Sequence, residues 1–143
     1  MPKQTSHSVL LGIDYGTKRI GLAIGQAITR TAQAIPLITC KNHLPNWHNI
    51  THVLREWGVD GIVVGLPLNM DGSPQPITAL THTFIAELKQ HTALPIYTVD
   101  ERLTTIEAKQ QLSQAARRPH RLAQQKVDSY AAKIILEAWF QQL

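Results

Sequence analysis

Three of the ten Asp and Glu residues in this 143-residue chain stand where surface charge explains a carboxylate poorly. Asp14 ends the apolar run SVLLGI, and Glu101 follows the apolar run PIYTV. Asp128 lies in a segment with helical spacing, and the positions that would share its face are Ala, Ala, Ile and Trp at 131, 132, 135 and 139. A carboxylate on an apolar stripe needs a partner, so these three acids are the first candidates for chemistry.

Two of these acids also have a structural explanation. Asp14 could form an Asx turn that starts a hairpin. Asp128 could interact with a helix dipole, but that benefit fades beyond the first turn, and the helix is predicted to begin several residues earlier. We therefore interpret Asp128 as functional and leave both explanations open for Asp14.

Carboxylates that meet at one point require a cation. Three of them would repel each other by about 4 kcal/mol per pair at 4 Å with an effective dielectric of 20. Hard oxygen ligands favour Mg²⁺ or Mn²⁺. Two such ions about 3.5 to 4 Å apart can activate a water and clamp a phosphate for in-line displacement. The acids therefore predict phosphodiester hydrolysis.

Positive charge is concentrated in one part of the chain. The formal net charge is +4 and the sequence pI is about 9.5. Residues 102–126 hold six Lys and Arg and one acid, Glu107, so this segment is +5 (six minus one). A solvated helix with a basic loop would explain the run, but beside a cluster of carboxylates a nucleic-acid track explains it better.

Apolar patterning places these residues on an α/β framework. Strands are predicted at 8–13, 19–25 and 34–39, and the first two should form a hairpin. Further strands are predicted at 61–66 and 95–99, with helices at 46–57, 77–90, 104–115 and 123–141. We expect one domain over residues 1–143, with a mixed five-stranded sheet whose first three strands are antiparallel and whose later strands are parallel, covered by helices on both faces. Ligands bind at the carboxyl ends of such strands, which would bring Asp14 and Glu101 to one edge if their strands are neighbours.

Composition narrows the class of protein. Apolar residues make up 43% of the chain and charged residues 17%, as in soluble domains. Residues 1–8 are polar and precede a short apolar run, so we expect no signal peptide, no membrane span and a cytoplasmic location. Cys40 is the only cysteine, which excludes an internal disulfide. His48 and His52 have zinc-pair spacing, but Asn49 stands where the metalloprotease motif needs Glu. The tryptophans at 47, 57 and 139 fall on helical apolar stripes, which favours core packing.

Four blocks of sequence, in the expected order, resemble the YqgF/RuvX family. They are GIDYGTKRIGLAIG at 12–25, IVVGLPLNMDGS at 62–73, VDERLTTIEA at 99–108 and KVDSYAAKIILEAWF at 126–140. Proteins of this family are RNase H-like nucleases described as Holliday junction resolvases and as pre-16S rRNA nucleases. The resemblance covers nearly the whole chain and implies an RNase H-like sheet. Some relatives carry Ser-Asp where this chain has Gly25 and Gln26, so no role is carried over for that acid.

The resemblance also implies roles for individual residues. Asp14, Glu101 and Asp128 would be the catalytic, metal-binding set, with Asp14 bridging two Mg²⁺ or Mn²⁺ ions and the other two completing the coordination and orienting the attacking water. Residues expected to bind the substrate are Lys18, Arg19, Asn69, Asp71, Arg102, Arg117, Arg118 and Arg121. Solvation of a hairpin could also explain the Lys-Arg pair, and turn chemistry could explain the Asn and Asp in the loop at 67–76.

On this resemblance we expect a metal-dependent endonuclease that processes the 5′ end of pre-16S rRNA in ribosome biogenesis. RNA is expected as the partner before DNA, and the protein is expected to be a monomer or weak homodimer. A Holliday junction resolvase is the first alternative, because both reactions use the same metal chemistry and residue spacing does not separate them. The second alternative is a nucleotide-binding domain, because GIDYGT also resembles the phosphate hairpin of actin-like and sugar-kinase ATPases. Those proteins close two domains around a nucleotide. A nonenzymatic RNA-binding factor in ribosome assembly is the third alternative.

Overall fold

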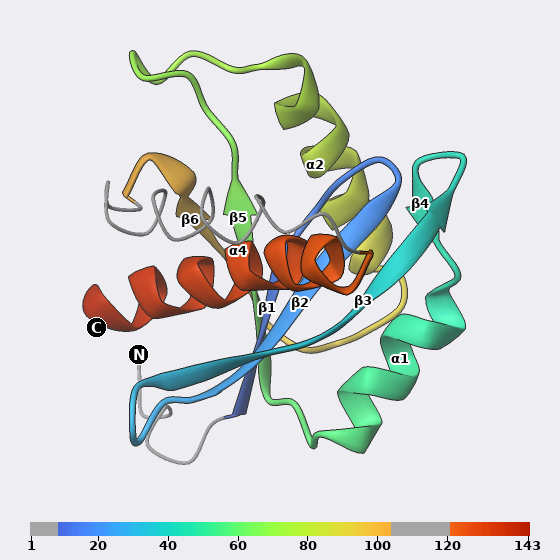
Figure 1. Cartoon of the computed structure of the whole chain (residues 1–143), viewed down its shortest axis with the longest axis vertical. Helices are drawn as coiled ribbons and strands as arrows, with labels where there is room; N and C mark the ends of the chain where they lie inside the picture. The colour runs from blue at the N-terminus through green and yellow to red at the C-terminus, as the bar shows by residue number, and fades with distance from the viewer. Residues whose placement is uncertain (1–8, 104–120) are drawn as a thin grey trace.

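A computed structural model describes the backbone of residues 9–103 and 121–143, and the side chains of residues 9–102 and 129–143 (Figure 1). The helix expected at 104–115 therefore lies outside the described residues, as do Arg117 and Arg118. The side chains of Arg121 and Asp128 lie outside them too, although the backbone of both belongs to a described helix.

A six-stranded mixed sheet forms the centre of the molecule, in the order β4-β3-β2-β1-β5-β6 (Figure 1). The strands are β1 Val9–Asp14, β2 Arg19–Gln26, β3 Thr31–Lys41, β4 Leu44–Pro45, β5 Gly61–Leu66 and β6 Ile96–Asp100. β1 pairs antiparallel with β2 and parallel with β5, and β5 pairs parallel with β6. The expected mixed sheet is confirmed, but its expected count of five strands was one too low. β4 has two residues, one of them proline, and such a segment is too short to show a period.

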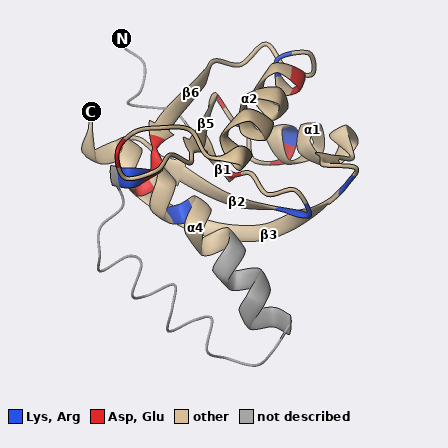
Figure 2. Cartoon of the chain, turned by 90° about the horizontal axis from the view of Figure 1, so that it is seen from above, with Lys and Arg blue, Asp and Glu red and all other residues tan. Residues whose placement is uncertain are grey.

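Helices cover both faces of this sheet (Figure 2). α1 spans Trp47–Glu56 and α2 spans Pro76–Leu88, and both pack on one face. α4, Arg121–Gln141, packs on the other face. The first two helices begin where local chemistry satisfies their free N–H groups: the Asn46 side chain accepts from the N–H of His48 at 3.0 Å, and Gln75 and Thr78 form a capping box.

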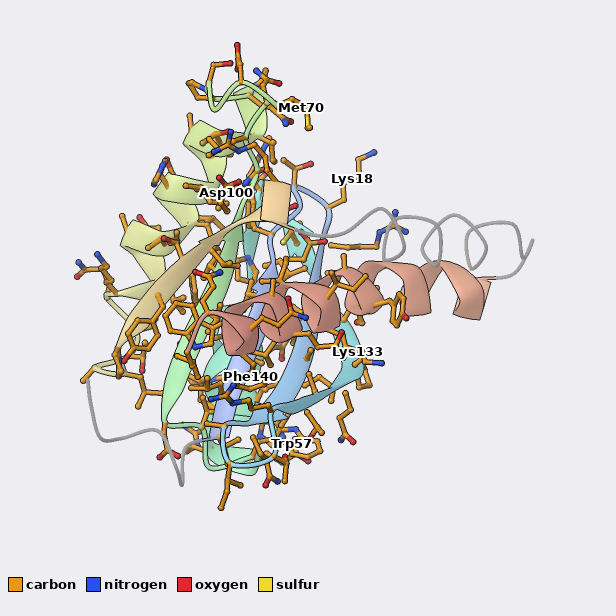
Figure 3. All side chains as sticks on the ribbon, turned by 90° about the vertical axis from the view of Figure 1, so that its left-hand side faces the viewer. Lys18, Trp57, Met70, Asp100, Lys133 and Phe140 are labelled. Atoms are coloured by element: carbon orange, nitrogen blue, oxygen red, sulfur yellow. The ribbon has the colours of Figure 1, made fainter. Side chains whose placement is uncertain are left out.

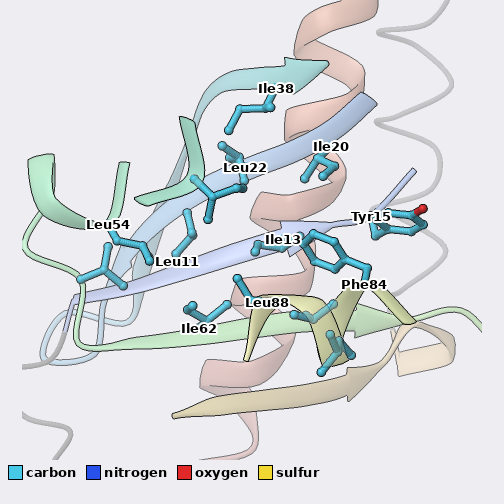
Figure 4. Packing of buried hydrophobic residues seen from close by; sticks show 14 of the residues in the cluster. Leu11, Ile13, Tyr15, Ile20, Leu22, Ile38, Leu54, Ile62, Phe84 and Leu88 are labelled. Carbon is cyan, nitrogen blue, oxygen red and sulfur yellow. The ribbon is translucent and has the colours of Figure 1, made fainter. Parts of the chain in front are cut away.

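Alternation along β1 divides the core into two layers. Leu11 and Ile13 point to the α1 and α2 face, where Phe84 and Leu88 complete a cluster of fully buried side chains (Figure 4). Leu10 belongs to the smaller cluster under α4. Because side chains alternate along a strand, Asp14 lies on the same face as Leu10 and therefore on the α4 face.

The tryptophans divide between core and surface. Trp47 stacks on Phe84 with ring centroids 5.6 Å apart, and Trp139 stacks on Tyr97 at 4.8 Å. The expectation of core packing was wrong for Trp57, which is 38% exposed. α1 ends at Glu56, so Trp57 occupies the C-cap, where the helical stripe no longer faces the sheet. Within the described ranges, no helix is long and apolar enough to cross a membrane.

Candidate active site

Three parallel strands bring two of the predicted acids to one edge of the sheet. Ile13 in β1 pairs with Val64 in β5, and Leu66 in β5 pairs with Asp100 in β6. Asp14 is the last residue of β1, and Glu101 is the first residue after β6. Both acids therefore lie at the carboxyl ends of strands, on one edge of the sheet as predicted, but β5 separates the two strands, which the prediction had taken as neighbours.

Gly65 in β5 leaves space between these two strand ends. A Cβ atom at this position would lie 3.0 Å from Oε2 of Glu101 and 2.9 Å from Cγ1 of Ile135 in α4. The carboxylate of Glu101 thus reaches over β5 toward the α4 face, which is also the face of Asp14. A larger residue at position 65 would occupy the space that the Glu101 carboxylate uses.

α4 crosses the sheet above the same strands. Ala132 and Leu136 are fully buried, and a Cβ at Gly12 of β1 would lie 2.9 Å from the carbonyl oxygen of Ala132. The predicted apolar face of this helix is confirmed for its described residues. Position 128 is one helical turn before Ala132, on the side of β1 where Asp14 stands. Its side chain lies outside the described part of the chain, so its approach to Asp14 and Glu101 stays a prediction.

The two adjacent acids at the end of β6 differ in their electrostatics. Burial raises the pKa of Glu101, and the negative charge of Asp100 raises it further. The pKa of Asp100 is lowered, mainly because its carboxylate accepts hydrogen bonds from Arg102. Asp100 is therefore satisfied by a protein cation, whereas burial opposes the ionisation of Glu101. A carboxylate in that situation is stabilised by a bound cation.

The donor set fits a hard divalent ion. Asp14 and Glu101 offer carboxylate oxygens, the ligands preferred by Mg²⁺ and Mn²⁺. Among side chains of residues 9–102 and 129–143, no group of three or more His, Cys, Asp or Glu lies close enough to hold a metal. The third predicted acid, Asp128, is not among those side chains.

The β1–β2 hairpin places two cations beside Asp14. A pocket of about 270 Å³ is lined by Asp14, Gly16, Thr17, Lys18, Arg19 and Gly21. Lys18 and Arg19 are both exposed. The side chain of Lys18 projects from the same end of the molecule as Asp100 (Figure 3). The structure thus brings this predicted pair to the edge where the acids lie.

The other predicted substrate-binding residues that are described make contacts within the protein. Nδ2 of Asn69 donates to Oγ of Ser73 at 2.9 Å, and Oδ1 of Asp71 accepts from the N–H of Ser73 at 2.9 Å. The hydrogen bonds that the Asp71 carboxylate accepts from the hydroxyl and the N–H of Ser73 lower its pKa. Arg102 forms an ion pair with Asp100 at 2.6 Å. Asn69 and Asp71 thus stabilise their own loop, and Arg102 already has a carboxylate partner.

Gly65 and Asp100 lie at the edge of the sheet that carries the acids, but the sequence did not predict a role for either of them there. The sequence alone does not assign a role to Gly65, because Gly occurs inside strands for several reasons. One of these reasons is the close approach of another group to the strand, and the structure shows that this is the case here. Asp100 stands directly before the candidate ligand Glu101, and only its contact with Arg102 reveals that it binds a cation of the protein.

Comparisons with known proteins find similar sequences over nearly the whole chain. A family model described as "RuvX: Holliday junction resolvase" matches residues 8–142. A protein of Coxiella burnetii (strain RSA 493 / Nine Mile phase I), named "Putative pre-16S rRNA nuclease", is 43% identical over 144 residues, which cover 99% of this chain and 97% of that protein. A protein of Azotobacter vinelandii with the same name is 44% identical over 132 residues, 92% of each chain.

Solved structures share the fold at low sequence identity. The structure "T. thermophilus RuvC in complex with Holliday junction substrate" superposes with a TM-score of 0.57 at 16% identity over 95% of each chain. The Fowlpox virus resolvase in complex with Holliday junction DNA superposes with a TM-score of 0.55 at 11% identity, over 94% of this chain and 97% of the viral one. These likenesses confirm the expected RNase H-like α/β fold.

Proposed function

This chain belongs to the RuvX family, and we propose that it is a divalent-metal-dependent nuclease that trims the 5′ end of pre-16S rRNA. The observation that carries the proposal is the carboxylate of Glu101, which lies over Gly65 of β5 beside the end of the strand that carries Asp14. The names of the Coxiella and Azotobacter relatives favour RNA as the substrate. Acting on pre-rRNA would place the protein in the cytoplasm, and a single active site would suffice for trimming.

The residues at this edge suggest a division of labour. Asp14 and Glu101, with Asp128 from α4, would hold Mg²⁺ or Mn²⁺, which when bound supplies an activated water and stabilises the leaving oxygen. Lys18 and Arg19 would bind the phosphates on either side of the cleaved bond. Glu101 is partly buried, which reduces the screening of its carboxylate by water and so strengthens its interaction with a cation.

Resolution of four-way DNA junctions is the second candidate function. The description of the matching family favours it, and so do the two structural neighbours, both of which were solved with Holliday junction DNA. A resolvase makes two symmetric cuts and would need a two-fold dimer. The proposed site serves both reactions, so the substrate must be identified by experiment.

The test offers three substrates side by side. Purified protein with Mn²⁺ or Mg²⁺ is incubated with an RNA spanning the 5′ end of pre-16S rRNA, an unrelated single-stranded RNA and a synthetic four-way junction. Asp14→Asn and Glu101→Gln should each lower the cleavage rate by more than about 100-fold, because even outer-shell partners of a metal typically contribute 10- to 100-fold. Glu87→Gln, an exposed residue of α2, is the matched control and should cleave normally.

The outcomes separate the candidates. Cleavage of the pre-16S fragment that depends on Asp14 and Glu101 supports the proposal. Cleavage of the junction alone would establish the resolvase and refute rRNA trimming. Activity that survives both substitutions would refute the metal site itself.

A further inference from the structure

The loop between β5 and α2, residues 67–75, is preorganised by its own hydrogen bonds. Leu68 and Pro74 form an antiparallel bridge across its base. The N–H of Asn69 donates to the carbonyl of Ser73 at 2.8 Å, and Asp71 accepts from both the N–H and the hydroxyl of Ser73, at 2.9 and 2.6 Å. A loop with this many internal bonds keeps its shape without a ligand.

Arg102 fastens this loop to the active-site edge. Its Nη1 donates to the carbonyl oxygen of Met70 at 3.1 Å, while Nε and Nη2 donate to Oδ2 of Asp100 at 2.8 and 2.6 Å. The guanidinium also packs beside Gly72, whose φ of +90° suits glycine, and where a Cβ would lie 3.4 Å from Nη1. Because Glu101 stands between Asp100 and Arg102, one fork of hydrogen bonds fixes the loop relative to the proposed metal ligand.

The side chain at the tip of this fixed loop is apolar and exposed. Met70 is 81% exposed, although its carbonyl is held by Arg102. It lies at the same end of the molecule as Lys18 and Asp100, whereas Trp57 lies at the opposite end (Figure 3). Single exposed apolar residues are common, but one on an immobilised backbone beside a catalytic edge can bind without a further ordering cost.

Charge around the loop indicates what it can bind. The Arg102 guanidinium pairs with the Asp100 carboxylate at 2.6 Å and also donates to the carbonyl oxygen of Met70. The loop therefore presents no uncompensated cation from Arg102 to a phosphate. A thioether packs well against an aromatic face, and Met is among the apolar side chains that proteins insert beside nucleobases.

We propose that Met70 packs against the face of an unpaired nucleobase next to the cleaved phosphodiester bond, and that Arg102 is the positioning residue that holds it there. This inference rests on the proposed nuclease function and adds a preference to it: cleavage is favoured where a nucleotide beside the cleaved bond is unpaired and carries its base. In this role Arg102 acts through the loop and does not bind phosphate.

The first experiment removes either the side chain or the base. Cleavage sites are mapped on whichever probe wild-type protein cuts, the pre-16S fragment or the four-way junction. Two versions of that probe are then made, each abasic on one side of the cleaved bond. Wild-type protein should show a kcat/KM roughly two- to tenfold higher for the intact probe than for one of the abasic versions, the range of a sulfur–aromatic contact. Met70→Ala should lose this preference.

A matched control is Ile28→Ala. Ile28 is an apolar residue 64% exposed in the β2–β3 turn, beyond the strand ends opposite to the active site. This variant should keep the wild-type preference. A Met70→Ala protein that also keeps it, or a wild-type protein without any preference, would overturn the inference while Asp14-dependent cleavage still supports the nuclease. Absence of cleavage of every probe would overturn both.

The second experiment separates positioning from phosphate binding. Arg102→Lys keeps the charge but cannot reproduce the fork to Asp100 and Met70. This variant should show the same reduced preference for the intact probe as Met70→Ala. The double variant Met70→Ala with Arg102→Lys should show no further fall in that preference. Retention of the preference by Arg102→Lys would overturn the positioning role. So would a fall of about one in the salt-dependence slope of binding for Arg102→Ala, the mark of a lost phosphate contact.

Discussion

Gly65 offers the sharpest test of the active-site geometry. In Gly65→Ala the new methyl carbon would stand 2.9 Å from Cγ1 of Ile135 and 3.0 Å from Oε2 of Glu101. Carbon atoms of real side chains essentially never approach that closely, so a neighbour must move. Ile135 is 2% exposed and enclosed by the core under α4. Cδ1 of Ile135 lies nearer still, so Ile135 must shift, and we expect the Glu101 carboxylate, the free end of a flexible side chain, to shift with it.

The expected cost differs between stability and activity. Overpacking of a core by one methyl group typically costs about 1–3 kcal/mol. For a chain of this length that lowers Tm by roughly 3–10 °C. A misplacement of about 1 Å at a reacting group can lower the rate about 100-fold. Gly65→Ala should therefore remain folded at assay temperature and lose most of its nuclease activity.

The assay compares two alanines on one strand. Tm is measured by circular dichroism, and cleavage with Mn²⁺ is measured well below both Tm values. Gly61→Ala is the control, because position 61 is on the same strand and face and its Cβ would lie 3.0 Å from Cδ2 of Leu10, at the opposite end of β5 from Glu101. It should lose some stability and keep its activity. Equal activity in the two variants would refute the placement of Glu101 over β5 as a requirement for catalysis.

Two further predictions concern protonation and the hairpin. Glu101→Gln should raise the Tm of the metal-free protein at neutral pH, because burial and Asp100 raise the pKa of Glu101 and its ionised form therefore opposes folding. The gain should shrink as the pH falls toward about 4.5, the pKa of the unfolded chain, and vanish below it, where the carboxyl is protonated in both states; a gain independent of pH would contradict this. Tyr15→Phe should lower the free energy of unfolding by about 1 kcal/mol in urea denaturation, because the Tyr15 hydroxyl donates to the His43 carbonyl at 2.6 Å. Unchanged stability would show that this bond contributes nothing net.

Sequence periodicity was sufficient for most of the framework. The apolar runs at 8–13, 19–25 and 61–66 correspond to β1 Val9–Asp14, β2 Arg19–Gln26 and β5 Gly61–Leu66. Alternation and helical spacing are local properties, since each reports which face of an element its residues occupy. They located Asp14 and Glu101 at strand ends for the same reason. They missed β4, which has two residues and is too short to show an alternation, and misplaced Trp57, which lies just past the end of its helix.

Only the tertiary structure decided which residues of different strands, helices and loops contact one another. The strand order sets β5 between β1, which ends at Asp14, and β6, which ends just before Glu101. Gly65 is therefore the position that leaves space for the Glu101 carboxylate. Arg102 turned out to hold Asp100 and the carbonyl of Met70, 32 residues away, where the sequence alone had favoured phosphate. The same packing raises the pKa of Glu101. Contacts between residues far apart in the sequence depend on how whole strands and helices pack together. The spacing of apolar residues within one strand or helix carries no information about this packing.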